Sequence, residues 1–402
     1  MVDITYLDNN ATTRLAPEVF SEMRPYLEEH YGNPSSIYHF GSQVGKKIEE
    51  ARERVQMLLG AEYATEVIFT ASATEATATA IHSALEAYPE RREIVTSVIE
   101  HPATLALCQH LERQGYRVHW IAVDSKGSLD LTTLKSVLTE RVAVVSLMWA
   151  NNETGTLFPI ETVGSWVKEV GAQFHVDAVQ VVGKHPINIA QTSIDMLSLS
   201  AHKFHGPKGV GALYVKRGNR FRPLLRGGHQ ERGRRAGTEN TAGIIGLGKA
   251  AELAISSLAD DLSRIKVLRD HLEQTLLAVV PHSFVTGDPQ CRVANTCNIA
   301  FEFIEGEALL LMLDQLGIAA SSGSACTSGA LEPSHVMKAM GVPLTAAHGT
   351  LRFSLSRYTT EEEINRVIDA LPKIVAQLRN LSPYWNAETN SADMSSFVPQ
   401  YG

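Results

Sequence analysis

Cysteine is scarce in this sequence. Four cysteines occur in 402 residues, and no two of them form a Cys-x-x-Cys pair. This scarcity excludes a disulfide framework and a zinc site of clustered thiolates, so we expect free thiols. The four are Cys108, Cys291, Cys297 and Cys326.

Long apolar runs and excess positive charge are also missing. No run approaches the about 20 residues that a membrane-spanning helix needs, and Met1 to Tyr6 show no basic and apolar leader. The chain carries 36 Lys and Arg against 44 Asp and Glu, a net charge of −8. Such a chain is poorly suited to nucleic acid or an anionic membrane surface. We therefore expect a cytoplasmic protein with neither as its partner.

The sequence does contain many apolar, strand-like segments. At 44% hydrophobic residues the chain is long enough for a large core and two domains. Strands buried on both faces and separated by helical patterns predict a mainly parallel sheet in an α/β domain. We expect these strands at 66–70, 93–98, 117–123, 142–149, 173–176, 196–199 and 211–215.

A smaller α+β domain is expected to follow. A helical pattern at 251–277 leads into strand-like segments near 295–301, 316–320 and 349–355. A helix then opens at Thr360, where Glu363 completes a capping box. We assign residues 16–254 to the large domain, 1–15 and 255–385 to the small one, and 386–402 to a tail.

Lys203 is the most informative residue. It follows the apolar run 194–200, and a lysine delivered from a sheet into a partly dry pocket can condense with an aldehyde, as in binding of pyridoxal 5'-phosphate (PLP). The alternative is an exposed lysine in a turn. Asp177 ends another apolar strand, where a carboxylate would keep the ring nitrogen of PLP protonated. Gln180 could donate to the phenolate oxygen of the ring.

Further candidates follow other strands, where ligands of open α/β sheets bind. Residues 69–75 connect the end of a predicted strand to a predicted helix through small residues. This strand–turn–helix arrangement offers backbone amides and the Thr74 hydroxyl to a phosphate. An ordinary helix cap remains the alternative. His101 could stack on the ring and move protons, or simply begin a helix. Asn152 could contact substrate or cofactor, in a segment that also suits a turn. Ser200 and His202 could hold phosphate oxygens.

Two features point to the substrate. Cys326 lies in a run of Gly, Ser, Ala and Thr that gives little packing, so we expect an exposed thiol on a mobile loop, as covalent sulfur transfer requires. A small residue in a tight turn is the alternative. Arg352 lies inside an apolar strand, where its planar guanidinium group suits a substrate carboxylate or a structural ion pair.

His202 and His205 bracket Lys203 in a turn, which does not favour a metal site.

In combination, these motifs resemble the NifS/IscS cysteine desulfurases. The resemblance covers nearly the whole chain, and residues 226–238 and 381–385 look closest to the NifS branch that serves nitrogenase. One departure is the phosphate turn, where Ser72 and Ala73 stand in place of a glycine-containing pattern. The motifs are residues 9–13, 73–75, 100–102, 151–155, 175–180, 201–203, 234–240 and 322–329.

The resemblance implies PLP-dependent fold type I, like aspartate aminotransferase, and a homodimer. It implies that L-cysteine becomes L-alanine while Cys326 takes the sulfur as a persulfide, for iron–sulfur cluster assembly through a NifU-type scaffold. Cys326 could also bind iron in a cluster through that persulfide. Thr238 would reach the phosphate of the neighbouring subunit. The remaining cofactor contacts implied are Ala73, Thr74, His101, Asn152, Asp177, Gln180, Ser200, His202 and Lys203.

Alternatives remain open from the residues alone. A selenocysteine lyase or a cysteine-sulfinate desulfinase of this fold would need Cys326 less. A scaffold that binds PLP or an iron–sulfur cluster without catalysis is weakly supported by four unclustered cysteines. A basic cluster between Arg222 and Arg235 suits RNA or, in this acidic chain, the phosphate of an adjacent subunit.

Overall fold

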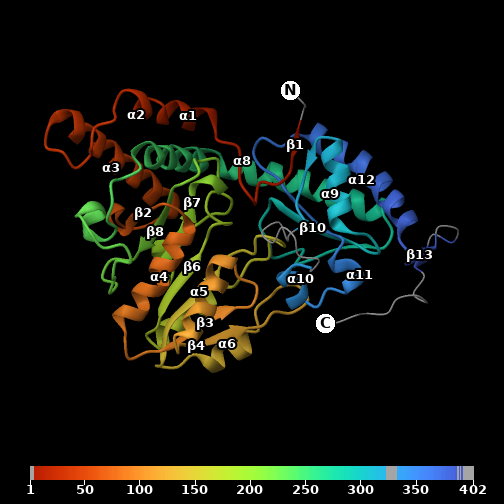
Figure 1. Ribbon diagram of the computed structural model, residues 1–402, viewed down its shortest axis with the longest axis horizontal. Helices are drawn as coiled ribbons and strands as arrows, with labels where there is room; N and C mark the ends of the chain where they lie inside the picture. The colour runs from red at the N-terminus through yellow and green to blue at the C-terminus, as the bar shows by residue number, and fades with distance from the viewer. Residues whose placement is uncertain (1–3, 323–332, 387–388, 390, 393–402) are drawn as a thin grey trace.

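The computed structural model describes residues 4–322, 333–386, 389, 391 and 392. Its largest element is a seven-stranded sheet in the order β2-β8-β7-β6-β5-β3-β4 (Figure 1). Every neighbouring pair is parallel except the two pairs that involve β8. The mainly parallel α/β sheet predicted from the sequence is therefore confirmed. Its strands are β2 (Val67–Thr70), β3 (Glu93–Ser97), β4 (Arg117–Ile121), β5 (Val142–Met148), β6 (Gln173–Asp177), β7 (Met196–Ser200) and β8 (Gly211–Val215).

Helices cover both faces of this sheet. Alternation along β2 shows the two sides, because Ile68 packs with the helices of one face while Val67 and Phe69 pack with those of the other. The first face carries α4 (Ala73–Ala87) and α5 (Pro102–Arg113). The second carries α1 (Pro17–Met23), α3 (His39–Leu59), α7 (Ile160–Glu169) and the start of α8 (Thr241–Val279). Two shorter helices are α2 (Pro25–Glu28) and α6 (Leu131–Val137).

A second core lies around a small antiparallel sheet, β12-β10-β9. The C-terminal part of α8, together with α9 and α12, packs on it. The predicted capping box is present, since Thr360 accepts from the amide of Glu363 and Glu363 accepts from that of Thr360. The elements in this part of the chain are β9 (Ser283–Val285), β10 (Thr296–Phe301), α9 (Gly306–Gln315), α10 (His335–Ala339), α11 (Leu344–Ala347), β12 (Thr350–Ser354) and α12 (Glu361–Leu381). Of these, α10 packs in the core of the large sheet through Val336 and Met337.

Short strand pairings complete the structure. The N-terminal strand β1 (Thr5–Tyr6) pairs in parallel with β11 (Ile318–Ala319), which joins the start of the chain to the second core. Near the C-terminus, β13 (Trp385–Asn386) pairs with β14 (Ser391–Ala392).

Helix α8 begins ten residues before the predicted start at 251, and Figure 1 shows it running from the large sheet to the second core. Its first turns are rich in glycine, which weakens the helical pattern in the sequence. Close packing explains the glycines, because a Cβ on Gly248 would lie 2.6 Å from the Cβ of Ala51 in α3. In the described part of the chain, α8 alone is long and apolar enough to cross a membrane by length and composition. Its residues Leu247, Ala250 and Ala251 are nevertheless fully buried in the core.

Candidate active site

A cavity of about 540 Å³ opens beyond the carboxyl ends of the central strands, as expected for an open α/β sheet. Its walls come from both cores, since Arg352 belongs to β12 and the other predicted residues to the large sheet and its loops. Ten of the residues proposed from the sequence line it together: Ala73, Thr74, His101, Asn152, Asp177, Gln180, Ser200, His202, Lys203 and Arg352.

Lys203 ends a short 3₁₀ turn (Ala201–Lys203) directly after β7. Its Nζ donates to the backbone carbonyl oxygens of Asn10 at 2.7 Å and Ala11 at 2.8 Å. Both acceptors are neutral, and together they fix the direction of the amine along the cavity wall. The interpretation of Lys203 as an exposed turn lysine is wrong, because the side chain lines the cavity.

Asp177 ends β6, and one of its carboxyl oxygens, Oδ1, accepts from the amide of Val179 at 3.0 Å. Its other oxygen has no hydrogen-bond partner among the described residues. Burial raises the pKa of Asp177, while the Val179 amide, His101 and Lys203 act in the opposite direction. Such a carboxyl group is suited to share a proton with a basic nitrogen in the cavity.

His101 begins α5 as its N-cap, so the alternative of a helix-starting histidine is also true. Its Nδ1 accepts from the amide of Ala103 at 3.2 Å. A backbone amide can only donate, so the hydrogen of the neutral imidazole is on Nε2. Burial lowers the pKa of His101, and the charge of Asp177 opposes that shift. The ring therefore offers an N–H donor toward the cavity.

The start of α4 forms another wall of the cavity. Ser72 caps the helix by accepting from the amide of Glu75 at 3.2 Å. The amides of Ala73 and Thr74 are the first of the helix and have no acceptor within it, so they suit a phosphate. Ser72 has φ −168°, which is extended backbone, so the turn does not need a glycine there. Gly211 allows the close approach of β8, since its Cβ would lie 2.9 Å from the Ser72 carbonyl carbon.

Ser200 and His202 reach the same cavity from the end of β7 and the turn after it. The Nδ1 of His202 lies 3.0 Å from Thr12 Oγ1. Burial, aided by the charges of Lys203, Lys208 and Lys184, lowers the pKa of His202 to about 4, so it is neutral at physiological pH.

Arg352 in β12 is 4% exposed. Its Nη2 forms an ion pair with Asp8 Oδ1 at 2.6 Å, and its Nη1 donates to the Asn152 carbonyl oxygen at 2.9 Å. The Nε is buried and has no hydrogen-bond partner among the described residues. The structural ion pair considered from the sequence is therefore present, and the side chain of Arg352 also lines the cavity.

Sequence reasoning missed the role of Asn10, although it lies in one of the family motifs. Its carbonyl oxygen accepts from Lys203 and from Gln180 Nε2 at 3.0 Å, and its side-chain Oδ1 accepts from Lys184 at 3.2 Å. Lys184 also donates to Gln180 Oε1 at 2.8 Å, which fixes the orientation of that amide. Burial holds the pKa of Lys184 well below its usual value. No helical or strand period marks these contacts, since they join segments about 170 residues apart.

Buried acids behind the cavity were also missed. Glu100 accepts from Ser97 Oγ at 2.6 Å and from the amide of Met148 at 2.9 Å. Burial raises the pKa of Glu100 to about 8 and that of Glu153 to about 7. In the sequence, Glu100 directly precedes His101 and Glu153 directly follows Asn152. This proximity to predicted site residues could have identified both acids.

Thr238 was predicted to contact the cofactor of the neighbouring subunit, and it does not line the cavity of its own chain. Thr238 is exposed in the loop before α8. Cys326 lies outside the described residues. The three described cysteines are free, with Cys108 and Cys297 buried and Cys291 exposed. Among the described residues no group of three or more His, Cys, Asp or Glu side chains could hold a metal ion.

Two arginines of the basic cluster form close ion pairs within the chain. Arg235 pairs with Glu75 at 2.8 Å, and Arg226 pairs with Glu86 at 2.5 Å. Glu75 lies in the first turn of α4, so the Arg235 pair connects the loop before Thr238 with the helix start at the cavity.

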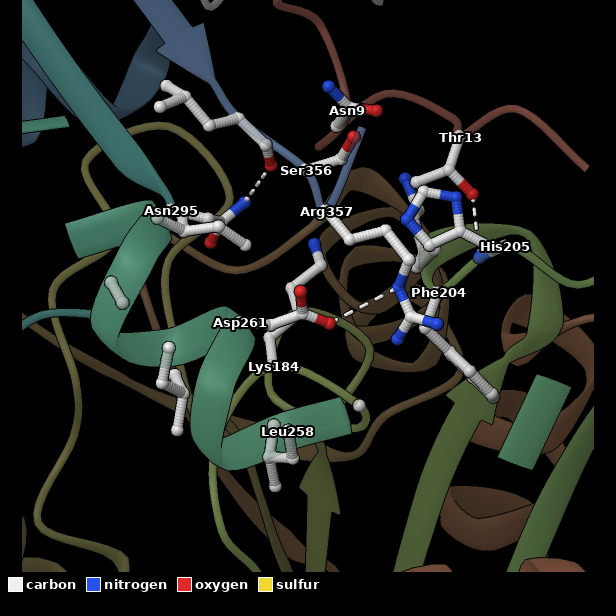
Figure 2. A pocket seen from close by; sticks show the side chains of 16 residues that line it. Asn9, Thr13, Lys184, Phe204, His205, Leu258, Asp261, Asn295, Ser356 and Arg357 are labelled. Carbon is white, nitrogen blue, oxygen red and sulfur yellow. Dashed lines mark hydrogen bonds and ion pairs between the residues drawn. The ribbon is translucent and has the colours of Figure 1, made fainter. Parts of the chain in front are cut away.

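A second, smaller cavity of about 40 Å³ is lined by Lys203 and by residues of α8 that include Leu258 and Asp261. Figure 2 shows this cavity from close by. Its polar lining includes Lys184, Asn295 and the ion pair between Asp261 and Arg357, 3.3 Å apart. The volume suits a few water molecules and excludes a cofactor.

A profile of the aminotransferase class-V family matches residues 5–367. The chain belongs to this family. It is 62% identical over 403 residues to "Cysteine desulfurase NifS" of Azotobacter vinelandii, covering 100% of both chains. A solved structure named "NIFS-LIKE PROTEIN" matches with TM-score 0.87 and 38% identity, covering 93% of this chain and 100% of that one. Another, "SspA in complex with cysteine", matches with TM-score 0.77 and 31% identity, covering 88% and 99%.

The class-V aminotransferase fold is PLP fold type I, as the sequence predicted, and PLP is the cofactor of this chain. The residues present fit the group. The cavity holds a lysine for the aldehyde, a buried carboxyl with one unpartnered oxygen for the ring nitrogen, and the start of α4 for the phosphate.

Proposed function

We propose that this protein is a PLP-dependent cysteine desulfurase that converts L-cysteine to L-alanine and takes the sulfur as a persulfide on Cys326. The observation that carries the proposal is the single cavity shared by Lys203, Asp177, His101 and Arg352. The 62% identity to a protein named cysteine desulfurase NifS supports the same activity and a role in sulfur supply for nitrogenase.

Bound PLP would supply an aldehyde for the substrate amine and a protonated ring that withdraws electrons from Cα. Lys203 would hold the aldehyde until substrate arrives, and its amine, steered by the carbonyls of Asn10 and Ala11, would then be placed to take the α-proton. His101 is the second candidate for that proton transfer. Asp177 would keep the ring nitrogen protonated.

The remaining residues would position the cofactor and the substrate. Ala73, Thr74, Ser200 and His202 would hold the phosphate, and Gln180 would donate to the phenolate oxygen, since Lys184 occupies its carbonyl. Asn152 and Arg352 would bind the substrate carboxylate, since both residues line the cavity. This carboxylate would be anchored next to the Asp8 ion pair, so its position is fixed before reaction.

We also propose the partners expected from the sequence. These are a second copy of this chain, which Thr238 would reach, and a NifU-type iron–sulfur scaffold that accepts the persulfide in the cytoplasm. The persulfide on Cys326 could also bind iron during transfer. The similarity to a protein solved as "SspA in complex with cysteine" supports cysteine as the substrate class.

The test is incubation of the PLP-loaded protein with L-cysteine and a thiol reductant. We expect alanine and sulfide in equal amounts, because one sulfur leaves each cysteine. The Cys326→Ala variant should retain PLP and form no alanine. Normal alanine output from that variant would favour a selenocysteine lyase or a desulfinase and contradict the proposal.

A further inference from the structure

His335 lines the active-site cavity and was not identified from the sequence. It is the first residue of α10, and its side chain is accessible from the cavity. Neither the cofactor contacts nor the carboxylate site described above uses it.

Two contacts fix the position of His335 between the ring site and the carboxylate site. Its Nε2 lies 3.1 Å from the carbonyl oxygen of Glu100, the residue before His101. Its neighbour Ser334 donates to Glu153 Oε2 at 2.6 Å, next to Asn152 in the chain. His335 therefore lines the same cavity as Lys203 and Arg352, where a bound substrate would lie.

The hydrogen-bond pattern determines the tautomer of His335. A carbonyl oxygen can only accept, so Nε2 carries the hydrogen and Nδ1 keeps a free lone pair. Nδ1 has no hydrogen-bond partner among the described residues. His101 has the opposite arrangement, with Nδ1 occupied by the Ala103 amide and the hydrogen on Nε2.

The neutral form of His335 is favoured. Burial lowers its pKa, and only the hydrogen bond to the Glu100 carbonyl acts in the opposite direction. Of the three imidazoles that line the cavity, His101 therefore offers a donor and His335 an acceptor.

We propose that His335 is a specificity-determining residue whose Nδ1 accepts a hydrogen bond from the thiol of the bound substrate. This inference rests on the proposed function. No bond is broken in this contact, since the hydrogen stays on the substrate sulfur. The contact would orient the sulfur and favour a side chain that ends in a hydrogen-bond donor over one that ends in a methyl group.

The test compares two ligands that differ only in the thiol. In full-length, PLP-loaded Cys326→Ala protein, which cannot complete sulfur transfer, dissociation constants for L-cysteine and L-alanine are measured from the visible absorbance of the cofactor. Adding His335→Phe should weaken L-cysteine binding about three- to tenfold, the worth of one hydrogen bond. Binding of L-alanine should not change. His335→Asn, which restores an acceptor, should recover part of the L-cysteine affinity.

A matched control is His110→Phe, because His110 is exposed on α5 and bonds only Gln114 among the described residues. It should leave both constants unchanged. If His335→Phe weakens the binding of both ligands equally, or of neither, the proposed role of His335 is wrong. The proposed function would still stand. A parent protein that does not respond to L-cysteine would overturn the proposed function and this inference with it.

Discussion

At the scale of single residues, Lys203 is the point on which cofactor attachment depends. Its amine is directed by two backbone carbonyl oxygens at the wall of the cavity. We predict that Lys203→Ala removes the visible absorbance of lysine-bound PLP and abolishes turnover. Lys168→Ala, an exposed lysine on α7, is the control and should change neither. Normal turnover by Lys203→Ala would refute this assignment.

Arg352 allows a prediction that separates substrate binding from chemistry. Lysine keeps the charge but loses the planar fork, so Arg352→Lys cannot serve Asp8, Asn152 and a substrate carboxylate together. We expect KM for L-cysteine to rise by about tenfold or more, with a smaller fall in kcat. Steady-state kinetics with PLP saturating provides the measurement. A fall in kcat with unchanged KM would show that Arg352 does not bind the substrate.

Much of the site was predictable at this scale, for a physical reason. Asp177 ends an apolar strand, Lys203 and Asn152 lie within four residues of the end of one, and the ends of neighbouring parallel strands meet at one edge. Asn10 and His335 were not predictable in this way. Each reaches the cavity through contacts with residues far away in the sequence, and neither follows a strand of the large sheet.

At the scale of elements, the start of α4 links stability to phosphate binding. Loss of the Ser72 cap should destabilise the protein by about 1 kcal/mol and misplace the amides of Ala73 and Thr74. Thr360→Ala is a matched control, since Thr360 caps α12 through the same kind of contact far from the cavity. We predict that both variants lower Tm similarly and that only Ser72→Ala weakens PLP binding. Equal PLP affinity in the two variants would argue against a phosphate at α4.

Element boundaries show where the sequence pattern was sufficient. The strands of the large sheet were predicted to within one or two residues, because each is an apolar run between polar turns. The start of α8 was wrong by ten residues, since Gly246 and Gly248 are explained by the approach of Met23 in α1 and Ala51 in α3. Helix propensity depends on each residue and its close neighbours in the sequence, so it cannot reveal a contact between distant helices.

At the scale of the whole molecule, the cavity is assembled from both cores, because Arg352 on β12 of the second core lines it together with residues of the large sheet. The boundaries 16–254 and 255–385 stay a prediction. Residues 1–15 were assigned to the small domain, but they contact both the second core and the large sheet. Thr5 pairs with Ile318 at the second core, whereas Asn10 and Ala11 hold Lys203.

The proposed dimer leads to a complementation test. If Thr238 serves the neighbouring subunit, mixing Lys203→Ala chains with Thr238→Ala chains gives mixed dimers with one site free of both defects. That site should recover PLP binding, even though Thr238→Ala alone weakens it by only about 1–3 kcal/mol. PLP retained per dimer at limiting cofactor is the readout. If mixed dimers show only the average of the parents, Thr238 acts within its own subunit.

The most direct measurement of the central claim is the mass of the protein after a single turnover. PLP-loaded protein is mixed with less L-cysteine than active sites, in the absence of reductant, and digested for mass spectrometry. The account predicts one additional sulfur atom on the peptide that contains Cys326, with alanine formed in the same amount. Alanine formed without added sulfur on Cys326, or sulfur found on Cys291 instead, would contradict it.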